Sequence, residues 1–479
     1  MSNSYSGHWG QKPAALVIVF ALASGLCMFY LALRWEIEPV YVIAIVTLVP
    51  LVLFAMRKWP LVILAGLLFV GEFKTAPAEG ISLTDPTMIF LLLLSGAVFL
   101  DTLFMLAIAK PGTFCALFKG QAAISILFLL FCAIMAVSLL YTRSEQGSMK
   151  VARFETFEVL AFFAPLLLLK KKEDVRQLLI AFVVLGIILS GQVIMDLLHP
   201  SKLVLSGNED VTKIGISEML GFAVLFGLHG KLGESGAIKY ACVVILLIGL
   251  VACLSRTALI SLLISLVVFP GVVRGGTGTL SRKHVFIGIA LAVLIAIPTL
   301  LWLVTLPAAQ GKLRWKVAEL LSLSSSSTLS AGTVNRRLDF DRSALEALEQ
   351  HPIIGLGVGG WSIFYYGEDD LHYPHNFLLE VGAEQGAIGL IPLIALLVML
   401  LRSAFKALHS APELAFAFPT LVFCISYQLM TGGVESRQLW FICGLSAATA
   451  RIAETSGLVT YAQSRVASPR FLRRRAALG

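Results

Sequence analysis

Long apolar runs recur along the whole chain, and each ends at a short polar or charged segment. A helix of about 20 apolar residues crosses the hydrocarbon core of a membrane. The pattern therefore predicts an all-α, polytopic transmembrane helical bundle with roughly 12–14 spans, because the short alternating segments of a transmembrane barrel are missing. The candidate spans lie at 14–33, 37–56, 59–72, 86–108, 122–141, 154–169, 177–198, 214–230, 237–254, 257–273, 284–306, 375–401, 412–431 and 437–453.

Composition leads to the same class of protein. Hydrophobic residues make up 58% of the 479 residues and charged residues only 14%. A soluble domain carries about 25% charged residues, so soluble and disordered proteins are excluded. The cysteines fall almost entirely inside apolar runs without metal-binding spacing, which indicates small buried side chains rather than zinc ligands or disulfides.

The distribution of positive charge predicts the orientation. With the N-terminus in the cytoplasm, more than half of the 37 basic residues fall in cytoplasmic segments, which predicts an N-in/C-in topology. The net charge of +8 then reflects helix flanks and contact with membrane lipids, and no nucleic-acid partner is expected. The predicted organisation is N-terminal transmembrane helices at 1–306, a periplasmic loop at 307–374, C-terminal transmembrane helices at 375–453 and a basic cytoplasmic tail at 454–479.

The long loop at 307–374 has internal order in its second half. Residues 336–350 read as an amphipathic helix. Residues 351–361 follow with one proline and four glycines, which predicts a tight turn that packs closely or exposes backbone N–H groups. The next helix is expected to begin at His375–Asn376. The partial apolar stripe of the amphipathic helix consists of Leu338, Phe340, Leu345 and Leu348.

Ionisable residues at membrane depth are the first candidates for chemistry. Arg256 lies in a turn between two apolar runs, where it could pair with Glu218 as a structural clamp or bind a phosphate through its planar guanidinium. Arg143, Lys150 and Arg153 form a second basic cluster, which could bind substrate or simply be a solvated face at the membrane surface.

Histidines and aromatic residues gather in the same long loop. His375 could cap a helix, or it could act as a general base because a neutral imidazole accepts a proton near pH 7. The His372–His375 pair is too irregular for a metal site, so no metal is expected. Trp361, Tyr365, Tyr366 and Tyr373 could stack against sugars or belong to an aromatic belt at the membrane surface.

The order of these motifs resembles the O-antigen ligase and polymerase superfamily. The resemblance rests on Ser255-Arg256-Thr257, on Arg337 with its amphipathic stretch, on the turn at 351–357, and on the segments at 375–380 and 384–390. It covers residues 254–392. Members are bacterial inner-membrane glycosyltransferases that take a glycan from an undecaprenyl-diphosphate carrier on the periplasmic face, without a required metal or other cofactor.

The resemblance implies roles for individual residues. Arg256 and Arg337 would hold the donor diphosphate, and His375 would stand near the acceptor hydroxyl or the anomeric carbon. Whether Arg336 or Arg337 fills the second role stays open. The further candidates for substrate binding are Arg336, Asn376, Arg143, Arg153, Lys213, Glu218, Glu380 and Glu384.

The sequence leaves the acceptor open. Ligases of the superfamily attach the glycan to lipid A–core, and polymerases attach it to the next repeat unit. This chain has Phe340-Asp341 where the family often has tryptophan, and Lys213 and Glu218 where it often has arginine and asparagine, which leaves room for a polymerase or an exopolysaccharide enzyme. A flippase or transporter of lipid-linked glycans is the alternative of another class. It is disfavoured because the intramembrane charges gather on one side.

Overall fold

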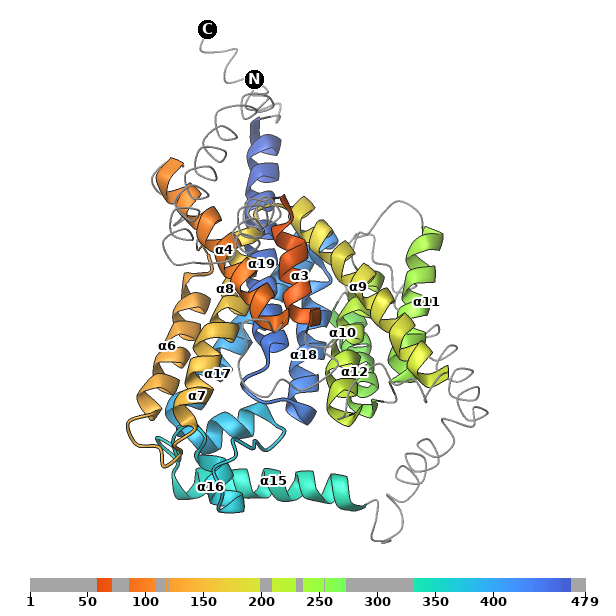
Figure 1. Cartoon of the computed structure of the whole chain (residues 1–479). Helices are drawn as coiled ribbons and strands as arrows, with labels where there is room; N and C mark the ends of the chain where they lie inside the picture. Colours follow the sequence, from red (N-terminus) through yellow and green to blue (C-terminus); the bar gives the residue numbers. More distant parts are fainter. Residues whose placement is uncertain are drawn as a thin grey trace, which may run out of the picture.

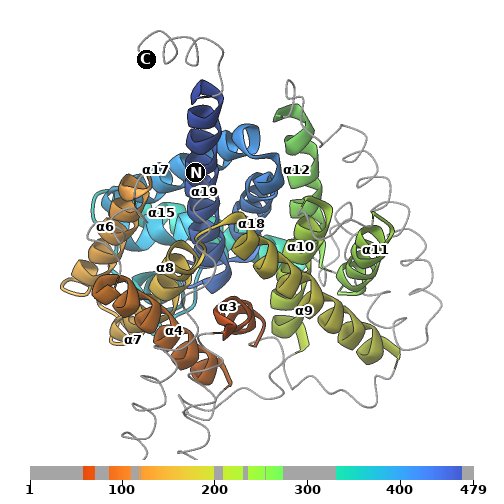
Figure 2. The same cartoon turned by 90° about the horizontal axis from the view of Figure 1, so that it is seen from above.

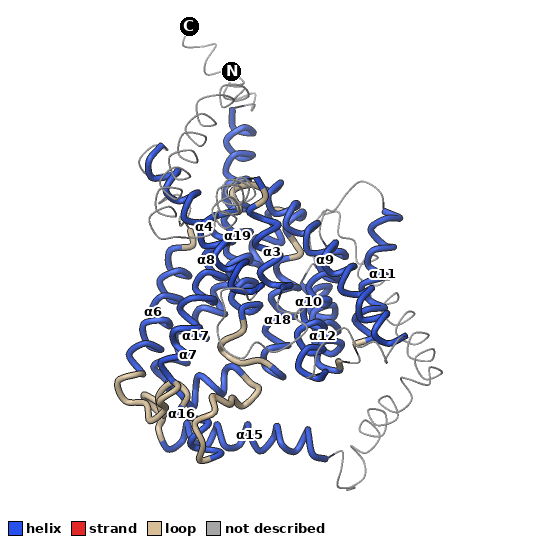
Figure 3. The backbone as a smooth tube through the Cα atoms, in the orientation of Figure 1, coloured by secondary structure: helices blue, strands red, loops and turns tan. Residues whose placement is uncertain are grey.

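The computed structural model describes residues 58–70, 86–108, 118, 120–198, 209–229, 236–253, 255–272 and 331–466. These residues form helices joined by turns and loops, and no strand occurs among them (Figure 3). The all-α prediction is confirmed. The predicted spans at 14–33, 37–56 and 284–306 lie outside the described residues, so the span count and the orientation stay predictions.

The apolar runs become the helices. Three described helical segments are long and apolar enough to cross a membrane, namely Lys172–Met195, Phe377–Ser410 and Pro412–Thr431, as expected of a membrane protein. The order along the chain is α3 (Pro60–Phe69), α4 (Pro86–Ile108), α6 (Ala122–Ser138), α7 (Gly147–Arg153), the π-helical turn η2 (Phe154–Glu158), α8 (Val159–Leu168), α9 (Lys172–Leu198), α10 (Glu209–His229), α11 (Gly236–Ala252), α12 (Arg256–Val272), α15 (Ala331–Gln350), α16 (Gly360–Tyr366), α17 (Phe377–Ser410), the 3-10 turn η5 (Pro412–Leu414), α18 (Ala417–Thr431) and α19 (Arg437–Val466).

Helices α18 and α19 pack against each other and join two groups of helices (Figures 1 and 2). On one side α19 packs against α8 and α17, and α17 packs against α6. The approach of α8 to α19 is close, because a Cβ at Gly444 would lie 2.1 Å from the Phe162 carbonyl oxygen. On the other side α18 packs against α10 and α12. Helix α15 lies across one end of this bundle, which is called the α15 end below (Figure 1).

Helix α15 confirms the predicted amphipathic helix but corrects its apolar stripe. The helix begins at Ala331 rather than Arg336. Phe340 is buried as expected, together with Ala344 and Ala347. Leu338 and Leu345 are instead exposed, at 48% and 46%. The side of α15 that faces the bundle is therefore made of small residues around one phenylalanine, which lets the helix lie close to α17.

A break in α17 lies at Gly386, whose φ of 61° and ψ of −157° are open to glycine alone. The break leaves the carbonyl oxygens of Ala383 and Glu384 without their helical partners. The glycine-rich turn supplies the missing donors, because Leu356 N donates to Ala383 O at 2.9 Å and Gly357 N donates to Glu384 O at 2.8 Å. The predicted tight turn thus uses its backbone N–H groups to cap half of a broken helix.

The same turn also accepts from the second half of α17. Ala387 N donates to Pro352 O at 2.9 Å, and Ile388 N donates to Ile353 O at 3.1 Å. All four backbone groups freed by the break are therefore paired, as buried backbone groups must be. The result is a fixed change of direction in α17 that sets the course of its first part, at 377–385.

We expect Gly386→Ala to destabilise the protein. A Cβ there would lie 2.5 Å from Ile353 O and 2.7 Å from Gly355 N, and the backbone conformation alone costs an alanine about 1–3 kcal/mol. Thermal unfolding in detergent measures the loss. Gly191→Ala in α9 is the matched control, because the Cβ it would add has no heavy atom within 4 Å apart from the neighbouring backbone of its own helix. Equal melting temperatures for the two variants would contradict the assignment.

Candidate active site

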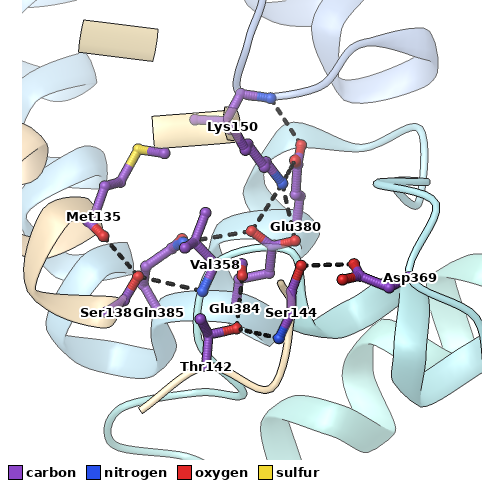
Figure 4. A network of polar contacts seen from close by, with 11 residues as sticks. Met135, Ser138, Thr142, Ser144, Lys150, Val358, Asp369, Glu380, Glu384 and Gln385 are labelled. Atoms are coloured by element: carbon purple, nitrogen blue, oxygen red, sulfur yellow. Dashed lines mark hydrogen bonds and ion pairs between the residues drawn. The ribbon is translucent and has the colours of Figure 1, made fainter. Parts of the chain in front are cut away.

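A buried ammonium group joins α7 to the first part of α17. Lys150 Nζ donates to Glu380 Oε1 at 2.6 Å and to Glu384 Oε1 and Oε2 at 2.9 and 2.8 Å (Figure 4). The three side chains are exposed by only 1%, 2% and 0%. An ammonium has three donors, and these contacts use all of them. Glu380 and Glu384, predicted to bind substrate, therefore hold Lys150 in this structure.

The loop before α7 is tied to the glycine-rich turn and to the segment after α16. Thr142 Oγ1 donates to Val358 O at 2.7 Å, and Ser144 Oγ donates to Asp369 Oδ1 at 2.6 Å (Figure 4). Val358 N donates in turn to Ser138 Oγ at 3.2 Å. These bonds fix α6 and α7 against the α15 end, so Lys150 meets the two carboxylates in one defined geometry.

The second oxygen of Glu380 anchors the loop between α18 and α19. Val434 N donates to Glu380 Oε2 at 2.7 Å, and Trp440 Nε1 donates to Val434 O at 2.7 Å. The charges of Lys150 and Glu380 both act on the pKa of Glu435, which lies in the same loop. This loop, residues 432–436, is thereby placed beside the Lys150 cluster, although no sequence motif singled it out.

A glutamine in α18 connects the same loop to α10. Gln428 Nε2 donates to Glu218 Oε1 at 2.7 Å and to Ser436 Oγ at 2.8 Å. Glu218 is buried, at 4% exposure. The predicted substrate residue Glu218 is therefore part of a polar chain that runs from α10 through α18 to loop 432–436.

Arg337 and His375 meet at the C-terminal end of α18. Arg337 NH1 donates to Met430 O at 3.0 Å, and the backbone of Thr431 is near enough to His375 to act on its pKa. The last carbonyl groups of a helix carry partial negative charge, so this end attracts the guanidinium of Arg337. His375 has a φ of 61°, a strained conformation for a residue with a side chain. Its ring lies 4.7 Å from that of Tyr373, measured between centroids.

The surroundings of His375 favour the neutral imidazole. Burial lowers the pKa of His375 below its ordinary value of 6.5, and the positive charges of Arg337 and Arg336 lower it further. The Thr431 backbone and Glu380 raise the pKa, each with a smaller effect than Arg337 but a larger one than Arg336. At neutral pH the ring is therefore uncharged and able to accept a proton.

Tyr373 lies where the charges of several elements overlap. Burial raises the pKa of its phenol, the negative charges of Glu380, Glu435 and Glu218 raise it further, and Arg337 opposes them. These groups come from α17, loop 432–436, α10 and α15, so the fold brings four separate segments to one place. Tyr373 therefore lies at the centre of the candidate site. Its phenol is protonated and uncharged at neutral pH.

The two neighbouring arginines of α15 differ in position. Arg337 is half-buried against α18, whereas Arg336 is exposed. The Arg336 guanidinium lies 5.5 Å from the ring centroid of Phe340, and its NH2 group donates to the Tyr366 hydroxyl at 3.4 Å. Arg256 is half-buried at the first residue of α12, a helix that packs against both α18 and α10.

The other predicted residues lie farther from this centre or serve the fold. Asn376 is the N-cap of α17, and its side chain accepts a hydrogen bond from Leu379 N at 3.3 Å. Arg143 and Arg153 are exposed, and Arg153 NH2 lies 3.1 Å from the sulfur of Met149. Lys213 belongs to α10 at a position whose side chain is outside the described part.

The aromatic residues of α16 form a small core rather than an open surface. Trp361 is fully buried, so it cannot present a face for sugar stacking or sit in a membrane belt. Its ring stacks on Tyr365 with centroids 5.4 Å apart, and Phe340 packs edge-on against it at 5.6 Å. This cluster fastens α15 to α16. Of the four aromatic residues predicted to stack against sugars, Tyr365, Tyr366 and Tyr373 are partly exposed.

Sequence reasoning grouped Lys150 with two exposed arginines and missed its role. Only a partial signal was present, because Val151 and Phe154 are apolar and lie one and four residues after Lys150, on the same side of a helix. Gln428 and Glu435 had no such signal, since a polar residue near a helix end is ordinarily solvated.

Comparison with known proteins finds a family match over part of this region. A family model described as O-antigen ligase matches residues 241–394, from α11 into α17. The matched region includes Arg256, Arg337, His375 and the two carboxylates that hold Lys150. This part of the chain is therefore similar to the O-antigen ligase family. A search of the curated proteins finds no match.

The superfamily implies a membrane enzyme of the ligase or polymerase type, with lipid-linked glycans as its substrates. The match covers less than half of the chain, and it excludes Lys150 and loop 432–436. Parts of the candidate site therefore come from segments outside the matched region, and the fold joins them to it through the contacts of Glu380.

We expect Lys150→Met to destabilise the protein strongly, because it leaves two buried carboxylates without their cation. Removing one partner of a buried ion pair costs about 3–5 kcal/mol. Thermal unfolding in detergent measures the loss, with Lys406→Met on the exposed face of α17 as the control. The triple change Lys150→Met, Glu380→Gln and Glu384→Gln should recover much of the stability. A Lys150→Met protein that melts with the control would refute the role of the cluster.

Proposed function

We propose that this protein transfers a glycan from an undecaprenyl-diphosphate carrier to an acceptor sugar hydroxyl, as an O-antigen ligase. The reaction would take place at the α15 end, which we assign to the periplasmic face of the bacterial inner membrane. The observation that carries the proposal is the meeting of a half-buried arginine, Arg337, with a neutral histidine, His375, at the C-terminal end of α18.

The donor side of the reaction needs fixed positive charge. When the bond between the anomeric carbon and the diphosphate oxygen breaks, negative charge grows on the leaving diphosphate. A guanidinium that is already held in place stabilises this charge without having to reorganise. Arg337 is held by Met430 O at 3.0 Å, and we assign it, together with Arg256, to the diphosphate. Arg336 is the weaker candidate because it is exposed.

The acceptor side needs a proton acceptor. A new bond forms between the acceptor oxygen and the anomeric carbon, and the hydroxyl proton must leave as this bond forms. We assign that proton to a ring nitrogen of His375, whose low pKa keeps it neutral and ready at pH 7. The products are the transferred glycan and the carrier diphosphate, so charge and atoms balance without a cofactor.

The carboxylates support these residues rather than act on the substrate. Both oxygens of Glu384 accept hydrogen bonds from Lys150, and Glu380 accepts from Lys150 and from the Val434 amide. Asn376 begins the helix that carries Glu380, next to His375 in the chain. We therefore treat these three as positioning residues, and we give Arg143, Arg153 and Lys213 no role in the transfer step.

A polymerase is the second candidate, since it would use the same donor and the same donor-binding arginines. Reconstitution of the purified protein with an undecaprenyl-diphosphate-linked repeat unit separates the two. Transfer only after lipid A–core is added, in a single attachment, is the expected result for a ligase. A ladder of lengthening chains without it would show a polymerase. No transfer to either acceptor would contradict both, and lipid-linked glycan movement across vesicles would then be measured.

In the same assay we expect Arg256→Ala, Arg337→Ala and His375→Ala to lower transfer by about 10²–10³-fold, the usual effect of losing one fixed charge-stabilising or proton-accepting group. Arg342→Ala is the control, because Arg342 lies on α15 with 80% of its side chain exposed. Membrane insertion should stay unchanged in all four. Wild-type transfer by the three site variants would remove the assignment.

The lowered pKa of His375 predicts the pH dependence. Protonation removes the base, so transfer should be nearly constant around pH 7 and fall as the pH drops through the pKa of His375, below 6.5. Arg336→Gln removes one positive charge near the ring, which raises this pKa and moves the acidic fall to higher pH. Arg342→Gln should leave the profile in place. Faster transfer in acid would contradict a neutral histidine base.

A further inference from the structure

Two exposed isoleucines form the tip of the glycine-rich turn. Ile353 and Ile354 are exposed by 65% and 46%. Neighbouring exposed side chains of this size, next to polar ones, are typical of a surface that contacts a membrane or another protein. The residues before them are polar, because Glu346, Glu349 and Gln350 at the end of α15 are also exposed. The tip is therefore a short apolar patch that follows a polar helix end.

The tip is joined to two helices whose outer faces are apolar. Ile353 O accepts from Ile388 N of α17 at 3.1 Å, and Ile354 O accepts from the Tyr141 hydroxyl, just after α6, at 2.7 Å. Both helices carry exposed apolar side chains along one side. They are Ile388, Ile391, Ile394 and Val398 on α17, and Ile126, Leu129, Leu130 and Val137 on α6. The tip thus adjoins the end of two apolar outer faces, and these two helices pack against each other.

The length of α17 gives the depth of the tip. This helix is one of the segments able to cross a membrane, and its first basic residues after Ile388 are Arg402 and Lys406. Ile388 precedes them by 14 and 18 residues, or about 21 and 27 Å of helix. The hydrocarbon core is about 30 Å thick. With either basic residue at the far boundary, Ile388 and the paired Ile353 therefore lie inside the near one.

The length of α6 leads to the outer edge of the same region. No charged residue occurs between Lys119 and Arg143, and this uncharged stretch has the length of one membrane span. Tyr141 lies at its end, and tyrosines are common where a span meets the membrane surface. Because the Tyr141 hydroxyl donates to Ile354 O, the tip lies close to this edge rather than deep in the bilayer.

The carbonyl groups of the turn do not depend on water. The carbonyl oxygens of residues 351–354 all accept hydrogen bonds, at 2.7 to 3.1 Å, from Gly355 N, Ala387 N, Ile388 N and the Tyr141 hydroxyl. Pro352 in addition has no N–H group to be left unpaired. An exposed turn in water can leave its carbonyls to solvent, whereas irregular backbone at membrane depth must find its partners within the protein. Four consecutive paired carbonyls at an exposed apolar tip therefore favour lipid as its surroundings.

We propose that Ile353 and Ile354 insert among the lipid acyl chains of the leaflet on the α15 side, and that they anchor the glycine-rich turn at the edge of the hydrocarbon region. Both residues belong to the segment at 307–374, for which the sequence predicts a loop outside the membrane. The tip is then a short return of that loop into the bilayer.

The anchor sets the height of the candidate active site above the membrane. Leu356 N and Gly357 N of the same turn cap the first part of α17, which carries Glu380 and follows His375. The site is thereby held near the level of the lipid head groups, where the diphosphate of a lipid-linked donor lies. This consequence rests on the proposed function, whereas the lipid contact itself does not.

Tryptophan fluorescence tests the contact. Purified Ile353→Trp and Ile354→Trp proteins are reconstituted in phosphatidylcholine vesicles with or without bromine on acyl carbons near the head group, which quenches a tryptophan that it touches. The signal of the wild type, with its seven tryptophans, is subtracted. We expect both variants to lose fluorescence to the same extent as Ile391→Trp, whose position on α17 is 66% exposed. Arg342→Trp is the control in water, because the Arg342 side chain is 80% exposed on α15, and only aqueous acrylamide should quench it.

Two outcomes would overturn the inference. If brominated lipid quenches Ile353→Trp and Ile354→Trp no more than Arg342→Trp, the tip stands in water. If neither brominated lipid nor acrylamide reaches them, another protein surface covers the tip, such as a second copy of this chain. The two tip variants are read independently, so one that fails to fold leaves the other. Neither outcome bears on glycan transfer, which the reconstitution assay measures separately in the wild type.

Discussion

The ammonium of Lys150 inside the bundle is the interaction on which the rest of the α15 end depends. It holds Glu380 and Glu384 together at 2.6–2.9 Å, and two carboxylates this close would repel each other without it. Because Glu380 also binds the Val434 amide, the position of loop 432–436 follows from the same cation. A buried ion cluster of this kind adds little stability over an apolar core, but it has few alternative arrangements. It therefore suits a place where three segments must meet in one geometry.

The break of α17 solves a related problem. A continuous helix would carry residues 377–385 straight on from the membrane-spanning part, and it would leave no backbone groups for the glycine-rich turn. With Gly386 in its special conformation, the turn at 351–361 pairs all four freed backbone groups and ties α15, through the same segment, to α17. The direction of the first part of α17 then decides where His375 lies, two residues before its first turn. Backbone pairing and the ion cluster thus act together on the same short helix.

The chemistry proposed for this site uses few groups, each held by the scaffold. Arg337 and His375 share the C-terminal end of α18, where the Met430 carbonyl holds the guanidinium in place. Nearby positive charge that suits a diphosphate also keeps the histidine neutral, so one arrangement serves donor binding and proton transfer.

What the sequence determined was local. Apolar runs of helical length set the all-α class, the bounds of most described helices and the helix of α15. The order of Arg256, Arg337 and His375 indicated the family, because such motifs lie within short segments. The tertiary structure alone decided that Lys150 points inward, that Trp361 is buried and that Gln428 and Glu435 belong to the site. Lys150 and Glu380 lie 230 residues apart, and the burial of a charge depends on which distant segment faces it. No local pattern contains that information, since it arises only when the helices pack.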